Sequence, residues 1–236
     1  MEGRGKGTRW VVVAVDLERT SGRGSDAAPV GVFVVSGHAL ERRALQETLE
    51  DEGLRVLGAT GSVAEALARV PVLLPDVAIL DTRIHEDVWI AVCRRIWDES
   101  PSVRCLTLGS LGSPAEVRGS VLAGAWGHAV RAVRGSDLLR RVRVVAAGKD
   151  LVDPAVRAAV LAEFGQPAPG PSLLAPAARR ILFLCAEGLS DRQIRGEMGL
   201  GEVEFEALLR SALGKLGYAA AAADDVEPEP PVPEPA

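Results

Sequence analysis

Short apolar runs alternate with amphipathic stretches between residues 30 and 149. The apolar runs are short enough for buried strands and lie at Val30–Val35, Leu54–Leu57, Val77–Leu80, Val103–Leu108 and Trp126–Val130. Apolar residues recur at helical spacing in the stretches that follow them, at Ala39–Glu52, Val63–Val70, Asp87–Trp97, Pro114–Ala123 and Ser136–Ala147. Strands that alternate with helices through short turns predict an α/β fold with a doubly wound, five-stranded parallel sheet.

A small all-α unit is predicted to follow at residues 174–218. It is separated from the α/β unit by residues 150–173, which we interpret as a linker with a short helix at Pro154–Phe164. Three prolines and two glycines between residues 165 and 171 cannot continue that helix. Within the all-α unit, Gly188 and Gly199 stand where helix C-caps are expected.

The two ends of the chain differ from these units in composition. Residues 1–29 are rich in Gly, Arg and Ser, and we expect a flexible extension there. Residues 219–236 carry five prolines, five acidic residues and no basic one, which predicts a disordered acidic tail. Because the formal net charge of the whole chain is −5, this tail accounts for all of it.

The amino-acid composition indicates in which compartment the protein acts and which kinds of chemical site it lacks. The chain has three widely spaced cysteines and no CxxC, which argues against a disulfide framework or a zinc site and favours a reducing, cytoplasmic location. Its apolar runs are far shorter than the roughly 18 residues of a membrane span, so we expect no membrane association. His38, His85 and His128 lack metal-ligand spacing and are interpreted as loop residues, and we find no catalytic constellation, metal site or cofactor motif.

Two groups of residues resemble a known family. Pro75-Asp76-Val77-Ala78-Ile79-Leu80-Asp81 is similar to the strand that leads to the phospho-accepting aspartate of bacterial receiver domains. Ala186-Glu187-Gly188-Leu189-Ser190, with Gly199-Leu200-Gly201-Glu202 and Leu213-Gly214-Lys215-Leu216-Gly217, is similar to a LuxR-type helix-turn-helix. The chain thus resembles response regulators of the NarL/FixJ group over about residues 30–218. The resemblance implies a flavodoxin-like strand order, DNA binding and control of transcription.

The residues that the resemblance places in the phosphorylation pocket depart from the family pattern. The family holds Mg²⁺ with two acids after its first strand, where this chain has Ser36 and Gly37, so that only Asp81 remains. The hydroxyl expected after strand four aligns with Gly109, and the lysine expected after strand five aligns with Arg131. Thr107 or Ser110 could replace that hydroxyl only if the alignment shifts by one or two residues.

We therefore interpret this unit as a degenerate receiver domain whose activity does not depend on phosphorylation. Asp81 remains the candidate phosphoacceptor under the alternative hypothesis, a conventional phosphorelay receiver. Without the other acidic ligands, however, an aspartate alone is a poor site for Mg²⁺.

In the all-α unit, the resemblance predicts a scaffold helix and a recognition helix. The scaffold helix is expected at Ser190–Met198 with Ser190 as its N-cap, and the recognition helix at Glu202–Leu216. The expected apolar anchors of the recognition helix are Val203, Leu209, Leu213 and Leu216, with Phe205 or Leu208 completing the face. The candidate DNA contacts are Ser190, Arg192, Arg195, Glu206, Arg210 and Lys215.

The charge of this unit leaves two functions open. Residues 174–218 hold six basic and six acidic residues, and Glu204 and Glu206 stand where the family places polar or basic contacts. Acids repel DNA phosphates, although they also favour a helix N-terminus. We expect a transcription factor that binds double-stranded DNA as a homodimer, or as a heterodimer with another response regulator. The alternative is a protein-interaction or ligand-sensing module that no longer binds DNA.

Overall fold

A five-stranded parallel sheet forms the centre of the N-terminal unit. The structure is a computed structural model and describes residues 29–84, 89–110, 112–131, 135–166 and 173–218. The strands are β1 (Gly31–Val35), β2 (Arg55–Thr60), β3 (Val77–Asp81), β4 (Arg104–Gly109) and β5 (Gly127–Val130). Their order, β2-β1-β3-β4-β5, confirms the predicted doubly wound fold and its flavodoxin-like strand order. The predicted extension, except residue 29, and the predicted tail lie outside the described residues.

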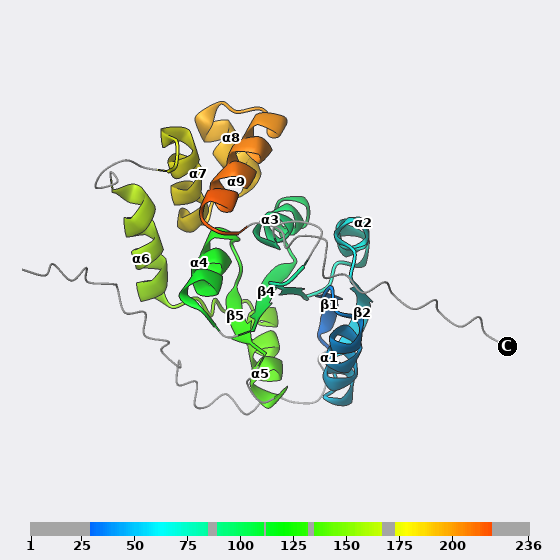
Figure 1. The fold of residues 1–236 in the computed structure, drawn as a ribbon. Coiled ribbons are helices and arrows are strands. Elements are labelled where there is room, and N and C mark those ends of the chain that lie inside the picture. Colours follow the sequence, from blue (N-terminus) through cyan, green and yellow to red (C-terminus); the bar gives the residue numbers. More distant parts are fainter. Residues whose placement is uncertain (1–28, 85–88, 111, 132–134, 167–172, 219–236) are drawn as a thin grey trace, which may run out of the picture.

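Five helices cover the two faces of this sheet (Figure 1). They are α1 (Ala39–Asp51), α2 (Val63–Leu73), α3 (Trp89–Glu99), α4 (Pro114–Leu122) and α5 (Gly135–Ala146). Helix α2 includes Pro71 and ends at Leu73, three residues beyond the predicted stretch Val63–Val70. Pro71 lies in the last turn, where it removes one hydrogen bond, and the Leu74 amide still donates to the Val70 carbonyl to close the helix.

Side chains alternate between two apolar layers along each strand, as the pleat requires. Val32, Val34 and Ile79 pack in the layer that includes residues of α1 and α5. Phe33 and Leu80 point to the opposite layer, which includes residues of α2, α3 and α4. All five residues of β3 are buried, as predicted for the apolar run Val77–Leu80, because β3 is the central strand and helices cover both faces of the sheet.

Four helices follow the α/β unit, and local sequence signals fix several of their ends. They are α6 (Pro154–Gly165), α7 (Pro176–Glu187), α8 (Asp191–Met198) and α9 (Glu202–Lys215). Gly188 and Gly199 adopt the left-handed conformation at the ends of α7 and α8, as predicted. Ser190 caps α8 in a capping box with Gln193.

The apolar face of α9 differs from the expectation at one position. Val203 was predicted as an anchor, but its side chain is 81% exposed, so this prediction is wrong. Phe205 is buried instead, together with Leu209 and Leu213. Residues 205, 209 and 213 are four apart and share one helix face, which residue 203 does not.

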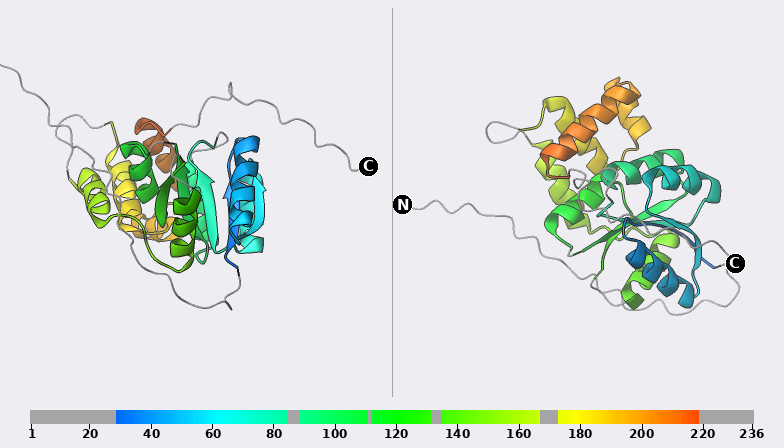
Figure 2. Two further views of the ribbon diagram at one scale, coloured as in Figure 1. Left: turned by 90° about the horizontal axis from the view of Figure 1, so that it is seen from below. Right: turned by 45° about the vertical axis from the view of Figure 1, so that its right-hand side comes forward.

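The C-terminal helices pack against the α/β unit beside α3 and α4 (Figures 1 and 2). One continuous apolar cluster includes Val121 and Leu122 of α4 and Ile181 and Leu182 of α7. Helix α6, which begins inside the predicted linker, packs against α7 and buries Val160 and Phe164 in the same cluster. The sheet and the helical module therefore share a core. Within the described ranges, no helix has the length and apolar character needed to cross a membrane.

Candidate functional site

The carboxylate of Asp81 lies at the end of β3, completely buried. Ser36 follows β1, the neighbouring strand, so parallel pairing brings the two residues together. The Ser36 hydroxyl donates a hydrogen bond to Oδ2 of Asp81 over 2.8 Å. Ser36 is also buried, and its own carbonyl accepts a hydrogen bond from Arg42 at 2.6 Å.

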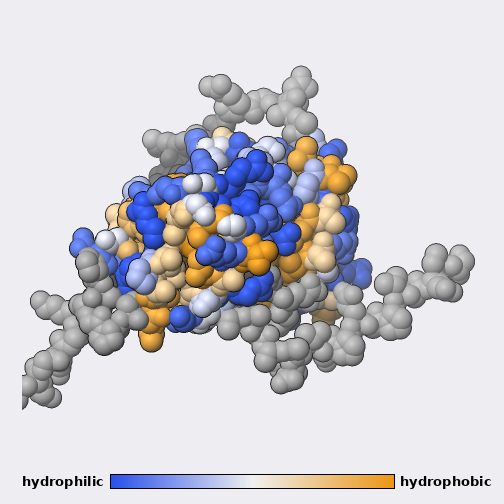
Figure 3. All heavy atoms as spheres, turned by 90° about the horizontal axis from the view of Figure 1, so that it is seen from above, coloured by the Kyte–Doolittle hydropathy of each residue, from blue (hydrophilic) through white to orange (hydrophobic). Residues whose placement is uncertain are grey.

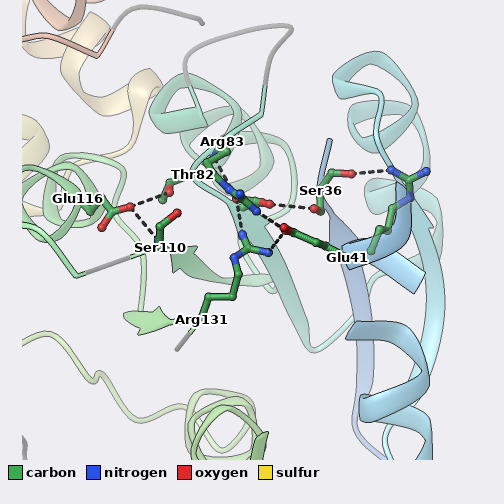
Figure 4. A network of polar contacts seen from close by, with 9 residues as sticks. Ser36, Glu41, Thr82, Arg83, Ser110, Glu116 and Arg131 are labelled. Atoms are coloured by element: carbon green, nitrogen blue, oxygen red, sulfur yellow. Dashed lines mark hydrogen bonds and ion pairs between the residues drawn. The ribbon is translucent and has the colours of Figure 1, made fainter. Parts of the chain in front are cut away.

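Two arginines neutralise Asp81. A terminal nitrogen of Arg131 lies 2.7 Å from Oδ1, and Arg83 approaches the same oxygen with its backbone amide at 3.0 Å and its Nε at 3.4 Å. Glu41 of α1 pairs with both guanidinium groups (Figure 4). Burial alone would raise the pKa of Asp81, but the bonds from Arg131, Arg83 and Ser36 outweigh it, so this pKa lies below its ordinary value.

Of the five residues predicted for the degenerate pocket, three are in direct contact: Ser36, Asp81 and Arg131. Gly37 lies in the turn between β1 and α1. Gly109 is the last residue of β4, as the sequence alignment placed it, and other side chains fill the space beside it. A Cβ on Gly109 would lie 2.6 Å from Cε1 of His128 and 2.8 Å from the carboxyl carbon of Glu116.

Glu116 holds the first turn of α4 against the ends of β3 and β4. Its Oε1 accepts hydrogen bonds from the Ser110 amide at 3.0 Å and from the Thr82 hydroxyl at 3.2 Å (Figure 4). Its Oε2 accepts from the Ser113 amide, which completes a capping box. Thr107 does not reach Asp81, because its hydroxyl bonds to Ser120 and His128.

Sequence reasoning missed Glu41, Arg83 and Glu116. Arg83 is only two residues beyond Asp81, which is a signal that could have been used. Glu41 stands in the first turn of a surface helix, where an acid is ordinary. Ligand atoms of His38, Glu41 and Asp81 lie within 4.8 Å of one another, but guanidinium groups already pair with both carboxylates.

The predicted DNA contacts lie on α8 and α9. Arg192, Glu206, Arg210 and Lys215 are exposed, and Arg195 is half-buried in an ion pair with Glu202 at 2.9 Å. Seen from the side of the molecule on which α8 and α9 lie, the surface is mostly hydrophilic, with smaller apolar areas (Figure 3). The exposed acids of the first turn of α9, Glu202 and Glu204, belong to this module.

The N-terminus of α8 is held by α3. Arg94 of α3 is completely buried and donates to the Asp191 carboxylate at 2.6 Å, to the Leu189 carbonyl at 2.7 Å and to the Leu122 carbonyl at 2.8 Å. The Asp98 carboxylate accepts a hydrogen bond from the backbone amide of Arg192 at 3.0 Å. A carboxylate of α3 therefore occupies the N-terminus of α8, a position that favours anions.

Beside this contact, a polar groove lies between α3 and the helices α8 and α9. Its lining residues are Arg95, Asp98, Glu99, Asp191, Arg195, Glu202, Phe205 and Glu206. Two of the predicted DNA contacts, Arg195 and Glu206, thus face acidic residues of α3 in this arrangement.

Comparison with known proteins agrees with this architecture. The family profile described as the response regulator receiver domain matches residues 32–143. The DNA-binding transcriptional activator DevR/DosR of Mycobacterium tuberculosis is 40% identical over 192 residues, which cover 80% of this chain and 88% of that protein. The nitrate/nitrite response regulator protein NarP of Escherichia coli is 25% identical over 194 residues, 81% of this chain and 90% of that protein.

A solved structure gives the same fold. A LuxR-family two-component response regulator from an Aurantimonas species matches with a TM-score of 0.51 at 19% identity, over 58% of this chain and 99% of that one. With the sheet order, the helical module and the identity to DevR/DosR, the chain belongs to the response regulator family, in its NarL/FixJ group. Its relatives are transcriptional regulators and not enzymes.

Replacing Arg131 tests the neutralisation of Asp81. In Arg131→Met, the buried carboxylate loses a charged partner, and we expect the free energy of unfolding at pH 7 to fall by about 2 kcal/mol. Because the folded pKa of Asp81 lies below the ordinary 3.8, this stabilisation is present above pH 3.8 and is lost as the pH falls through the folded pKa. Urea unfolding at several pH values should show the difference from wild type shrinking in acid. Arg43→Met, at an exposed pair with Glu47, serves as the control and should change little.

Replacing Arg94 tests the contact between α3 and α8. In Arg94→Met, the Asp191 carboxylate and two carbonyls lose their donor. We expect the free energy of unfolding to fall by about 3–5 kcal/mol. Amides near Leu189 and Asp191 should also exchange faster with deuterium. The matched control is Arg95→Met, which removes a neighbouring charge from an exposed pair with Glu99. Equal effects of the two variants would contradict the assigned role of Arg94.

Proposed function

We propose that this response regulator acts on transcription without phosphorylation of Asp81. The observation that supports this most directly is that two guanidinium groups and the Ser36 hydroxyl already surround the Asp81 carboxylate. Phosphoryl transfer to an aspartate needs a free carboxylate oxygen and a cation that neutralises the incoming oxygens. Here Oδ1 is paired with Arg131 and Arg83, and Oδ2 accepts from Ser36.

The residues present do not fit the Mg²⁺ that the receiver fold implies. Mg²⁺ prefers several hard oxygen ligands in octahedral geometry. Ser36 and Gly37 stand where the family has acids, and Glu41, the one other carboxylate that the described residues place beside Asp81, is bound to Arg83 and Arg131. A cation would have to displace two fixed positive charges. We therefore assign no step to a metal, and we propose that the ion cluster holds the pocket in one state.

Acetyl phosphate tests this proposal. After incubation with acetyl phosphate and Mg²⁺, the intact mass of the full chain should show no phosphoryl adduct, whereas a conventional receiver treated in parallel should show one. An adduct on the wild-type chain that disappears in Asp81→Ala would contradict the proposal and restore the phosphorelay alternative.

We further propose that the chain binds double-stranded DNA, as a homodimer or as a heterodimer with another response regulator. Support comes from the helix-turn-helix geometry of α8 and α9, from exposed Arg210 and Lys215, and from the DNA-binding activator that is 40% identical. Two-fold dimers match the paired half-sites that such modules read. Binding has to displace Asp98 from the N-terminus of α8, because a phosphate and the carboxylate would occupy the same place.

A gel-shift titration with a pool of random duplexes tests DNA binding. We expect saturable binding at low salt that weakens as salt rises, and the Arg210→Ala/Lys215→Ala double variant should reduce the salt slope by about 2. Asp98→Asn should bind more tightly than wild type, because it weakens the competing contact. The charge-matched control is Arg143→Ala/Lys149→Ala on and beside α5, which should leave the slope unchanged.

A protein-interaction module is the second candidate function. Two observations favour it. Glu202, Glu204 and Glu206 are exposed acids on α9, and the Asp98 carboxylate occupies the N-terminus of α8. If neither the wild type nor Asp98→Asn shows saturable binding at low salt, the DNA-binding proposal fails and this candidate replaces it.

A further inference from the structure

His128 lies in the middle of β5, so its interpretation as a loop residue was wrong. Its side chain points into a group of hydroxyls between β4 and α4. Nδ1 lies 3.0 Å from the Thr107 hydroxyl and 3.2 Å from the Ser120 hydroxyl, and these two hydroxyls are 2.7 Å apart. The proposed function leaves this cluster unused.

The acceptors around this cluster favour one tautomer of the ring. The Ser120 hydroxyl can donate to the Glu116 carbonyl at 2.9 Å, and the Thr107 hydroxyl can donate to the Ser120 oxygen at 2.7 Å. Each hydroxyl has a single proton, and carbonyls cannot donate. With both protons used in this way, Nδ1 must carry the proton that bonds to the hydroxyl oxygens. Nε2 is then the unprotonated nitrogen.

Nε2 is buried and has no hydrogen-bond partner in the part of the chain that the structure describes. The ring edge between the two nitrogens faces Glu116. Cε1 of His128 and the carboxyl carbon of Glu116 both lie within 3 Å of the point where a Cβ of Gly109 would stand. The glycine at the end of β4 thus leaves room for an imidazole and a carboxylate to face each other.

We infer that His128 is a proton sensor, in which proton uptake at Nε2 creates a donor for the Glu116 carboxylate and weakens the bonds through which Glu116 holds α4. The neutral-state bonds at Nδ1 need not change, because that nitrogen is a donor in both forms. The new donor competes with the Thr82 hydroxyl and the Ser110 amide for Oε1 of Glu116. Proton uptake therefore loosens the contact between α4 and the ends of β3 and β4.

Helix α4 connects proton uptake at His128 to the helical module. The Tyr218 hydroxyl donates to the Ala115 carbonyl at 2.6 Å and accepts from Nε of Arg118 at 2.9 Å. The Tyr218 ring also meets Trp89 edge to face, at 6.4 Å between centroids. Ala115 is adjacent to Glu116 in sequence. A displacement of the first turn of α4 thus reaches the end of the recognition helix directly.

The sign of the pH effect follows from the groups that face the ring. Burial lowers the pKa of His128, Glu116 from α4 raises it, and Arg141 from α5 lowers it, so that the pKa lies below the ordinary 6.5. A conformation with α4 released, in which His128 is solvated, binds the proton more tightly. The docked arrangement is therefore fully favoured above pH 6.5 and loses stability as the pH falls below it.

Nuclear magnetic resonance of the full-length chain tests the inference, because the chain has only three histidines and a single tyrosine. With ¹⁵N-labelled histidine, His128 should be protonated at Nδ1 at pH 8 and should titrate below 6.5. Its pKa should fall further in Glu116→Gln, which retains the capping box. On acidification, Tyr218 ring signals should shift and the amides of α4 should exchange several-fold faster, after correction for the intrinsic pH dependence of exchange.

The matched variant is His128→Asn, whose amide nitrogen can replace the Nδ1 donor but does not titrate. It should fold, and it should lose the acid-induced change at Tyr218 and α4. An Nε2-protonated neutral ring, or a pKa of His128 that does not change in Glu116→Gln, would overturn the inference. The same response to acid in His128→Asn and wild type would also overturn it. None of these outcomes depends on DNA binding or on phosphorylation.

Discussion

Complete burial of a carboxylate requires compensating charge, and at Asp81 this requirement determines the whole pocket. The desolvation cost of an isolated buried ion is far larger than one hydrogen bond can offset. Arg131 and Arg83 supply the compensation, and Glu41 in turn balances the two guanidinium groups. The loops after β1, β3 and β5 are thereby joined through fixed charges of the protein. Because the protein's own charges neutralise this pocket, we expect an ion added in solution to leave its conformation unchanged.

The helical module depends on a second buried charge. Arg94 links α3 to the loop before α8, while the apolar cluster continues from α4 into α7. Helix α4 contacts both regions, with Glu116 on one side and Ala115 and Arg118 on the other. The pocket and the helix-turn-helix are consequently connected by one short helix. This connection is the route by which a local change at the sheet edge can reach the recognition helix.

Regular elements and caps could be predicted from the sequence, whereas long-range ion pairs could not. The hydrophobic period located all the strands that the structure describes, and Ser190, Gly188 and Gly199 marked helix ends because capping is a local property. Val203 was misplaced because two apolar residues, Val203 and Phe205, stand near the start of the helix, and only packing decides which of them is buried. Glu41, Arg94 and Asp98 carried no signal, since surface helices are rich in charges and the partner of each lies tens of residues away. His128 was misinterpreted because its role depends on Gly109 and Glu116, which only the fold brings together.

The glycine at position 109 has a consequence for any attempt to engineer this pocket. A serine or threonine there would place its Cβ against the His128 ring and the Glu116 carboxylate, at 2.6 and 2.8 Å from atoms of these side chains. The imidazole is held in place by hydrogen bonds with Thr107 and Ser120. A hydroxyl-bearing side chain at this strand end therefore requires the His128 ring or the Glu116 carboxylate to shift. The size of the side chain at residue 109 is thus coupled to the positions of the two side chains that face it, so that a larger residue there and a rearranged His128–Glu116 pair have to be introduced together.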